Sequence, residues 1–248
     1  SIPSGAAASV TEVDTIAVYE TPTLLPVGET VFETGDQTGD DIGPGQPDTE
    51  DGTTPYTYPT GDGYADGTFD IDTFRVHETD DHYQFIYGVD TEVTNPDALE
   101  HGFSNQHLQL YVRDSSGDGG STAARTGVNA EFADPYHYRV VADGENGARL
   151  EDADGNEVAT GNVKINNAVY EIITEIPKRQ LDVSPETMQL APLMLGYNSS
   201  ADGNVMPVES EAAANAFGGA ENGSAPNIID MVTSDNTTQP QALSYSEG

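Results

Sequence analysis

Two acidic segments carry the side chains best placed to do chemistry, and that chemistry is cation binding. Segment 114–119 presents oxygens at alternate positions, from Asp114, Ser116 and Asp118, and then a glycine that allows a sharp turn. This is the first half of a calcium loop. Its twelfth position is Arg125, where an EF-hand needs a bidentate Glu, so a complete EF-hand is excluded. A partial site with a ligand from elsewhere in the chain stays open.

The second candidate lies in the glycine-rich segment 35–45, where Asp36, Asp40 and Asp41 would share a cation with backbone carbonyls. Hard oxygen ligands clustered on irregular backbone suit calcium. The alternative for both segments is a solvated acidic loop. We expect calcium in at least one of them.

Sequence patterns of catalytic sites are absent. The chain contains no Gly-x-Ser-x-Gly elbow, no His-Glu-x-x-His pair and no phosphate-binding loop, and its histidines lack metal-ligand spacing. Carboxylates are so frequent that their proximity does not indicate a glycosidase acid/base pair. We therefore expect a protein that is not an enzyme.

The charge balance indicates the environment in which the protein works. It has 43 Asp+Glu against 8 Lys+Arg, a net charge of −35. So many like charges oppose compaction in dilute buffer, whereas at molar salt a Debye length of about 3 Å screens them. This predicts a halophilic, archaeal or bacterial protein; an acidic calcium-binding protein from ordinary salt is the alternative. Nucleic acid is disfavoured as a partner because phosphates need a basic surface.

There is no Cys, so the chain has no disulfide framework and no thiol chemistry, and no apolar run approaches the roughly 20 residues of a membrane span. Two other features favour export. The chain begins with Ser, which we interpret as a processed start with any export signal removed. Sequons at Asn198, Asn222 and Asn236 predict a glycoprotein, with chance occurrence in an Asn-, Ser- and Thr-rich sequence as the alternative. We expect an extracellular or cell-surface protein that does not span the membrane.

The elements that must position these residues are β-strands. From residue 68 onward apolar side chains alternate with polar ones, most clearly at 83–89, where every second residue is apolar. Helical signal is confined to 96–101 and 209–217. Many short strands separated by turns predict an all-β fold, an antiparallel β-sandwich with long acidic loops. We assign the sandwich to residues 35–235 and a tail to 236–248.

Residues 1–34 are predicted to form a separate, extended β arm with Ile16, Val18 and Leu25 as its apolar anchors. Such an arm would add a strand to the sheet edge of a neighbouring subunit, by donor-strand exchange, and build a homopolymeric filament. The alternative is an ordinary strand that closes the sandwich of its own chain.

Several motifs together resemble a known family. Segment 39–45 (GDDIGPG), followed by 56–60 (YTYPT), is similar to the opening of the C-terminal domain of glucodextranases, which also occurs in some pullulanases and archaeal surface proteins. The resemblance covers roughly residues 35 to 232 and continues through 69–71, 95–96, 102–107, 217–219 and 226–230. It implies a DOMON-like β-sandwich that is exported, non-catalytic and attached to cell-surface or polysaccharide-related proteins.

Two functions follow as expectations. The first is an extracellular structural protein that assembles with copies of itself on the cell surface or into a filament. The second is a carbohydrate-binding module of a polysaccharide-degrading system, with Tyr56 and Tyr58 as the stacking platform, since the chain has no Trp. The alternative for these tyrosines is that they cap the core and keep their hydroxyls in water.

Overall fold

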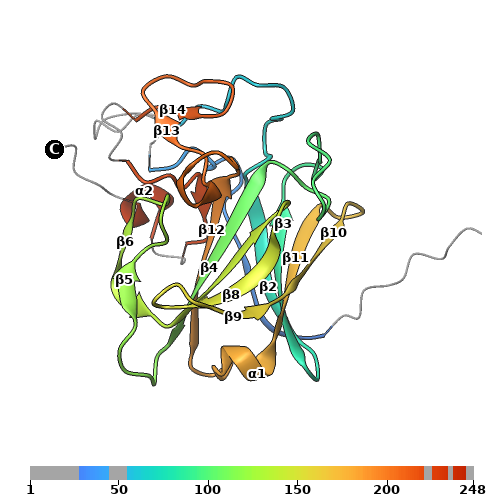
Figure 1. Cartoon of the computed structure of the whole chain (residues 1–248), viewed down its shortest axis with the longest axis vertical. Helices are drawn as coiled ribbons and strands as arrows, with labels where there is room; N and C mark the ends of the chain where they lie inside the picture. Colours follow the sequence, from blue (N-terminus) through green and yellow to red (C-terminus); the bar gives the residue numbers. More distant parts are fainter. Residues whose placement is uncertain (1–27, 45–54, 221–224, 234–236, 244–248) are drawn as a thin grey trace, which may run out of the picture.

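The computed structural model of the chain describes residues 28–44, 55–220, 225–233 and 237–243. These residues form two antiparallel β-sheets packed face to face, with loops gathered at the two ends (Figure 1). The predicted all-β sandwich is confirmed. The arm anchors Ile16, Val18 and Leu25 and the sequon residues Asn222 and Asn236 lie outside the described residues.

The main sheets have five and six strands. The first runs in the order β1 (Glu29–Gly35), β2 (Ile71–Glu78), β3 (His82–Val89), β11 (Glu171–Pro177) and β10 (Asn162–Asn166). The second runs in the order β15 (Asp230–Met231), β12 (Met188–Gly196), β4 (Gln106–Asp114), β7 (Tyr138–Asp143), β8 (Gly147–Asp152) and β9 (Glu157–Thr160).

Shorter elements connect and cover the sheets. Two small sheets pair β5 (Ser121–Ala123) with β6 (Glu131–Tyr136) and β13 (Val208–Glu209) with β14 (Phe217–Gly218). The helical turns are α1 (Lys178–Leu181), η1 (Asp202–Asn204) and α2 (Gln239–Ala242). The helices expected at 96–101 and 209–217 are wrong: the first segment forms turns, and the second runs from the end of β13 through turns to the start of β14.

The core lies between the two sheets, and the alternation of the strands builds it. Every second side chain of β3, from Tyr83 to Val89, points inward and is at most 4% exposed. The facing strand β4 contributes Leu108, Leu110 and Val112 to the same cluster. Truncating one of the fully buried rings, such as Phe85, would cost about 3–5 kcal/mol because it would leave a cavity.

The six-stranded sheet has a second apolar cluster on its outer face. Tyr111 of β4 and Leu193 and Leu195 of β12 point outward and pack there with residues of the covering loops and of the C-terminal segment. Because the second half of β12, from Pro192 to Gly196, is buried on both faces, it reads as a continuous apolar run rather than as an alternation.

One side of the sandwich is closed and the other is open. On the closed side Gly161 joins β9 of one sheet to β10 of the other. A Cβ atom at Gly161 would lie 2.4 Å from the carbonyl oxygen of Glu175, so this close approach requires glycine. On the open side β1 is the edge strand, with Val31 and Phe32 exposed at 38% and 45%.

Strand β1 belongs to the sandwich of its own chain. It pairs antiparallel with β2, from Glu29 opposite Glu78 to Gly35 opposite Thr73. Residues 29–34, which the sequence analysis assigned to the arm, are therefore an edge strand in cis. At the other terminus, α2 packs against the body, and Gln239 is 2% exposed.

Candidate metal centre

Three acidic side chains from two distant parts of the chain converge beside the end of β1. One carboxylate oxygen from each of Asp36, Asp40 and Asp230 lies within 4.8 Å of the others. Asp36 and Asp40 come from the loop that follows β1, and Asp230 is the first residue of β15. The cluster therefore connects the edge of the five-stranded sheet with the edge of the six-stranded sheet.

The loop that carries Asp36 and Asp40 is held in place from several directions. Gly39 and Gly43 adopt φ of +83° and +65°, values that glycine tolerates and that turn the backbone. The N–H of Gly43 donates to the carbonyl oxygen of Ile229 at 2.8 Å, next to Asp230. The side-chain amide of Gln239 donates to the carbonyl oxygens of Asp40, Gly43 and Ile229.

A fourth carboxylate, Asp70, lies close enough to interact electrostatically with these acids, but it is not among the three whose oxygens meet within 4.8 Å. It is 2% exposed and its Oδ2 accepts a hydrogen bond of 2.7 Å from the N–H of Gly39. Its negative charge raises the pKa of both Asp36 and Asp230, in each case after the larger effect of burial. We call Asp36, Asp40, Asp70 and Asp230 the carboxylate cluster.

The strands fix the orientation of Asp230. Its side chain is fully buried, and it accepts hydrogen bonds from the backbone N–H of Ile71, at 2.6 Å, and of Met231, at 2.7 Å. Both donors are backbone groups of sheet strands. Asp230 is thus a preoriented acid at the centre of the cluster.

Several oxygens of the carboxylate cluster lack a protein partner. Within the described part of the chain, Asp36 Oδ2, Asp40 Oδ1 and Asp70 Oδ1 are buried and accept no hydrogen bond. None of the ion pairs formed by described residues includes any of the four carboxylates. Buried polar atoms are nearly always satisfied in native proteins, so these free oxygens need a partner that is not a described residue.

Burial and mutual repulsion make the cluster hard to ionise. Burial raises the pKa of Asp36 to about 6. Burial, followed by the charge of Asp36, raises the pKa of Asp40 to about 7. The pKa of Asp70 also rises to about 7, and that of Asp230 rises well above its ordinary range, mainly through burial. A cation would relieve this repulsion, and the donor set of hard carboxylate oxygens fits calcium.

The sequence predicted part of this site. Asp36 and Asp40 do come together, but Asp41 does not join them: its carboxylate accepts a hydrogen bond from the hydroxyl of Tyr58. Sequence reasoning missed Asp70 and Asp230. The available signal was an acid directly before apolar strand residues, as in Phe69-Asp70-Ile71 and Ile229-Asp230-Met231.

The other predicted loop has a different geometry. Asp114 Oδ1 accepts hydrogen bonds from the backbone N–H and the hydroxyl of Ser116, at 2.9 and 2.7 Å, and these bonds lower the pKa of Asp114. Asp118 is exposed. Among the described residues, no group of three or more His, Cys, Asp or Glu side chains that could hold a metal includes Asp114 or Asp118. Calcium binding by this loop stays a prediction.

Tyr56 and Tyr58 do not form an exposed platform. Tyr56 is 3% exposed, and its hydroxyl donates to the carbonyl oxygen of Pro226 at 2.8 Å. The ring of Tyr58 packs edge-on against Phe69 and Phe217, at centroid distances of 5.3 and 6.0 Å. Both rings turn inward because each buries a large apolar area there while its hydroxyl still finds an acceptor. Neither offers a free face on which a sugar ring would stack.

The sequon at Asn198 is half-buried. Its side-chain nitrogen, the atom that would carry a glycan, donates to the carbonyl oxygen of Asn215 at 3.3 Å. Its side-chain oxygen accepts from the N–H of Ser200 at 3.0 Å. Glycosylation of Asn198 would have to break the first of these contacts.

Comparison with known proteins gives a family. Residues 31–248 match a family described as the C-terminal binding-module, SLH-like, of glucodextranase. No curated protein matches the chain. In the described residues no helix has the length and apolar character needed to cross a membrane.

Proposed function

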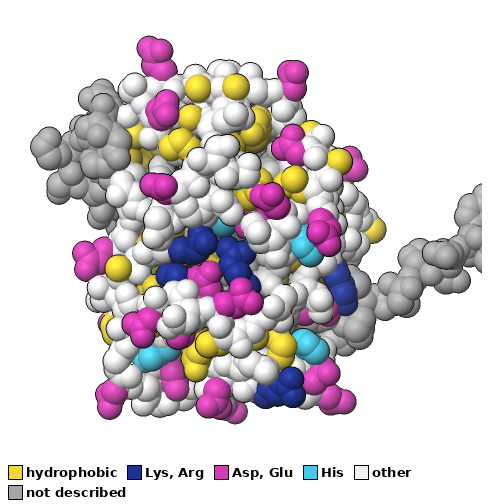
Figure 2. All heavy atoms as spheres, in the orientation of Figure 1, with side chains coloured by type: hydrophobic (Ala, Val, Ile, Leu, Met, Phe, Trp, Pro, Cys, Tyr) yellow, Lys and Arg dark blue, Asp and Glu magenta, His cyan; other side chains and the backbone are white. Residues whose placement is uncertain are grey.

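The chain belongs to the family of C-terminal, SLH-like binding modules of glucodextranase, and from this membership we propose that it is a non-catalytic module that binds polysaccharide at a cell surface. The observation that carries the proposal is the open half of the outer face of the six-stranded sheet. The second apolar cluster covers that face over β4 and β12, and none of its buried members lies on β8 or β9. Figure 2 shows charged side chains gathered in a hollow at the centre of this uncovered half.

The binding function is tested by retention on immobilised polysaccharides at about 2 M salt, where the Debye length is only a few ångströms and non-specific ionic adsorption is weak. The panel contains neutral α-glucans, a uronate polymer and a sulfated polymer. We expect the protein to be retarded on at least one of them. Elution from every column together with an acidic protein of similar size would contradict the proposal.

High salt is part of the proposed function. The net charge of −35 would make the protein repel itself and its targets in dilute buffer, and molar salt screens this repulsion. We therefore propose an extracellular protein of a halophile. The binding-module family supports the extracellular placement.

Calcium has a structural role in this proposal. We propose that the carboxylate cluster binds one calcium ion through Asp36, Asp40 and Asp230, with the free oxygen of Asp70 as a further ligand. The unpartnered, buried oxygens and the raised pKa values support this assignment. The ion would join the loop after β1 to β15 and so connect the two sheets at the open side of the sandwich.

Self-assembly through the arm is a second candidate function, supported by a groove at the open side. A pocket of about 300 Å³ is lined by Phe32, Glu33 and Thr34 of β1, Leu190 and Pro192 of β12, and Val232 and Thr233. In the described residues the ladder of β12 with β15 covers only Leu193 and Met194, so the outer edge of β12 is free at Leu190. An apolar groove beside two free strand edges suits an added β-strand.

The proposed occupant of this groove is segment 1–27 of another copy, with Ile16, Val18 and Leu25 as anchors. Deletion of residues 1–27 should leave a folded monomer that no longer polymerises and that binds a synthetic arm peptide in trans. Sedimentation and electron microscopy of both forms provide the measurement. A full-length protein that is monomeric at high concentration in molar salt would contradict assembly and leave the binding function untouched.

A further inference from the structure

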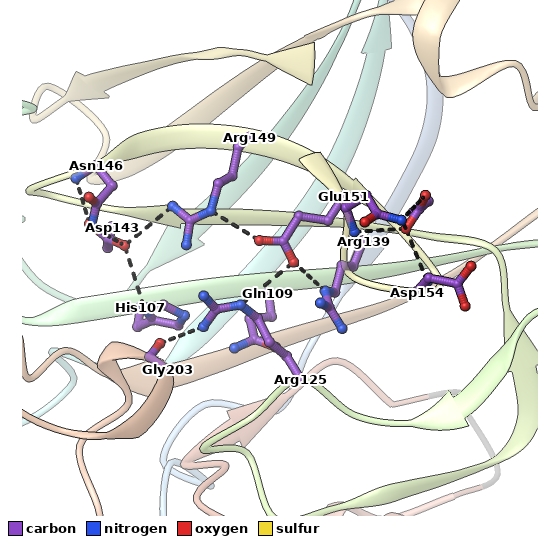
Figure 3. A network of polar contacts seen from close by, with 12 residues as sticks. His107, Gln109, Arg125, Arg139, Asp143, Asn146, Arg149, Glu151, Asp154 and Gly203 are labelled. Carbon is purple, nitrogen blue, oxygen red and sulfur yellow. Dashed lines mark hydrogen bonds and ion pairs between the residues drawn. The ribbon is translucent and has the colours of Figure 1, made fainter. Parts of the chain in front are cut away.

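Three arginines meet at one point on a chain that has 8 Lys+Arg in total. Arg125, Arg139 and Arg149 surround the carboxylate of Glu151 on the outer face of the six-stranded sheet (Figure 3). The Nε atoms lie 3.6, 2.5 and 3.1 Å, respectively, from the nearest Glu151 oxygen. On a surface dominated by acids, this concentration of guanidinium groups needs a reason.

The fold builds this arrangement from three elements. Arg139 of β7 stands directly opposite Glu151 of β8 in the ladder, and Arg149 lies two residues before Glu151 on the same face. Arg125 comes from the loop after β5. Its backbone N–H donates to the hydroxyl of Tyr111 at 2.9 Å, and its Nη1 donates to the carbonyl oxygen of Gly203. We call the place between these three side chains the arginine hollow.

Among the buried groups of the arginine hollow, positive charges outnumber negative ones. Besides Glu151, Asp143 also contributes a carboxylate: its buried Oδ2 lies 3.8 Å from Arg149 Nη1 and 3.8 Å from His107 Nδ1. His107 is fully buried, and burial, followed by the charges of Arg125 and Arg149, holds its pKa well below the ordinary value. With His107 neutral, three guanidinium groups face the two buried carboxylates of Glu151 and Asp143. The exposed Glu157 of β9, which pairs with Glu151 in the ladder with β8, adds a third carboxylate at the rim. The arginine side chains are only 10–16% exposed, so water screens the remaining charge weakly.

Buried donors without acceptors lie at the base of the arginine hollow. Gln109 is fully buried, and its Oε1 accepts a hydrogen bond of 2.5 Å from the hydroxyl of Tyr111, whose oxygen in turn accepts from the N–H of Arg125. The Nε2 of Gln109 has no acceptor among the described residues, and neither ring nitrogen of His107 makes a hydrogen bond there. The neutral ring of His107 carries one further N–H donor and one acceptor nitrogen. Unpartnered N–H donors therefore outnumber unpartnered acceptors at the base of the hollow.

The arginine hollow continues into a pocket with the polar lining that a sugar needs. This pocket has a volume of about 300 Å³ and is lined by Arg149 together with Asn146, Ala148, Glu157, Thr160 and Asn204. The amides and the hydroxyl suit sugar hydroxyl groups. A volume of this size is at the lower end for small-ligand sites.

We propose that the arginine hollow binds an anionic saccharide, with its carboxylate or sulfate against Arg125, Arg139 and Arg149 and its hydroxyl groups in the adjoining pocket. Guanidinium groups pair with such anions through parallel, charge-assisted hydrogen bonds. These contacts act at hydrogen-bond distance and therefore persist at molar salt. The same salt screens the long-range repulsion between the acidic protein and a polyanion. The inference rests on the proposed binding function and names its ligand class.

The test is a titration of the full-length ¹⁵N-labelled protein in about 2 M salt, where the Debye length is short. Three oligosaccharides of equal length are compared: an oligouronate, a sulfated glucan and a neutral α-glucan. The arginine Nε–Hε signals report the binding. We expect the signals of Arg125, Arg139 and Arg149 to shift with at least one anionic probe. The comparison of uronate with sulfate identifies the preferred anion, and the neutral glucan should leave the signals unmoved.

Substitutions locate the site. Arg125→Gln and Arg149→Gln should each weaken binding of the anionic probe about tenfold or more, as expected for the loss of hydrogen bonds to a charged group. Arg149→Lys keeps the charge but loses the two-pronged geometry of the guanidinium group. Its affinity for the anionic probe should lie between that of Arg149→Gln and that of the wild type. The matched control is Arg113→Gln, which removes the same charge from a guanidinium that pairs with Asp134 at 3.0 Å outside the hollow. This variant should bind the anionic probe with an affinity within about twofold of the wild type, because the long-range electrostatic effect of removing one charge is screened at this salt.

The outcomes separate the two ideas. The anion site would be overturned if the neutral glucan shifted the arginine signals as much as the anionic probes do, or if Arg113→Gln lost as much affinity as Arg149→Gln. Retention on a polysaccharide column would still support the binding function in that case. Failure of every polysaccharide to bind would overturn both. If Arg125→Gln or Arg149→Gln unfolds, the wild-type signals decide: a shift at Arg113 as large as that at Arg149 contradicts the proposal.

Discussion

Replacing Asp40 by Asn should stabilise the protein without calcium and destabilise it with calcium. Asp40 Oδ1 accepts no hydrogen bond from described residues, so the substitution removes a charge and leaves the packing almost unchanged. Without calcium that charge is unfavourable, because burial and Asp36 raise the pKa of Asp40 from 3.8 to about 7. With calcium the same carboxylate is a proposed ligand.

The magnitudes follow from the pKa and from mass action. A pKa of about 7 in place of 3.8 corresponds to about 4 kcal/mol at about 1.4 kcal/mol per pH unit for a fully ionised group. Because Asp40 is partly exposed, solvent screening reduces this to about 1–2 kcal/mol, so Asp40→Asn should gain about 2–8 °C in Tm without calcium at about pH 8. Calcium at 100 times its Kd adds about 2.7 kcal/mol to the wild type. A variant whose affinity is about 100-fold weaker gains only about 0.4 kcal/mol, so the order of stability reverses.

The assay is thermal unfolding at fixed ionic strength, with either EGTA or excess calcium. Asp118→Asn is the matched control, because it removes one charge from an exposed position in the other acidic loop. This control should respond to calcium as the wild type does. An equal change of Tm in Asp40→Asn with and without calcium would refute the reasoning, and so would a wild-type Tm that calcium does not move.

Three further predictions concern pH, salt and the C-terminal segment. Raised carboxyl pKa values mean that the calcium-free native state holds more protons than the unfolded state between about pH 4 and pH 7, so its stability should fall as the pH rises through this window. Calcium should abolish this decrease in stability. A Tm of the calcium-free protein that rises from about pH 5 to pH 8 would contradict the prediction. Calcium-free protein should melt at a clearly higher temperature in about 3 M than in about 0.1 M salt, because only the former screens the net charge of −35; equal melting temperatures would count against the halophile assignment. Gln239→Ala should cost about 1–3 kcal/mol in denaturant unfolding, since carbonyl oxygens lose their buried donor, whereas Gln241→Ala on the same helical turn should cost less.

The sandwich could be predicted because its signal is local. Alternation over 83–89 needs only neighbouring residues, and the structure buries each apolar member of that run. Asp36 and Asp40 were also within reach, since one glycine-rich loop carries both. The two missing acids of the carboxylate cluster were not, because Asp230 reaches the loop only through the pairing of β15 with β12.

The arginine hollow could not be predicted from local sequence either. Arg125, Arg139 and Arg149 are spaced too widely to form a motif, and they meet only once the register places Arg139 opposite Glu151. The prediction that Tyr56 and Tyr58 form a stacking platform failed for another reason. Their neighbours in sequence are typical of a loop, but the loop folds inward over Phe69 and Phe217, and the sequence pattern does not indicate that direction.

The placement of the carboxylate cluster also determines how the module would carry mechanical load. A pull between Gly28 and Leu243 enters β1 beside Glu78 and runs along the strand, so it loads the perpendicular ladder bonds with β2 in shear. It then crosses from the loop after β1 to the C-terminal segment through Gln239 and the carboxylates around Asp230. A bound ion would lie in series with β1 and would set the rate at which the module yields under tension. The arginine hollow lies away from this line of force, so a saccharide bound there would stay attached to an unstrained surface while the chain is under tension.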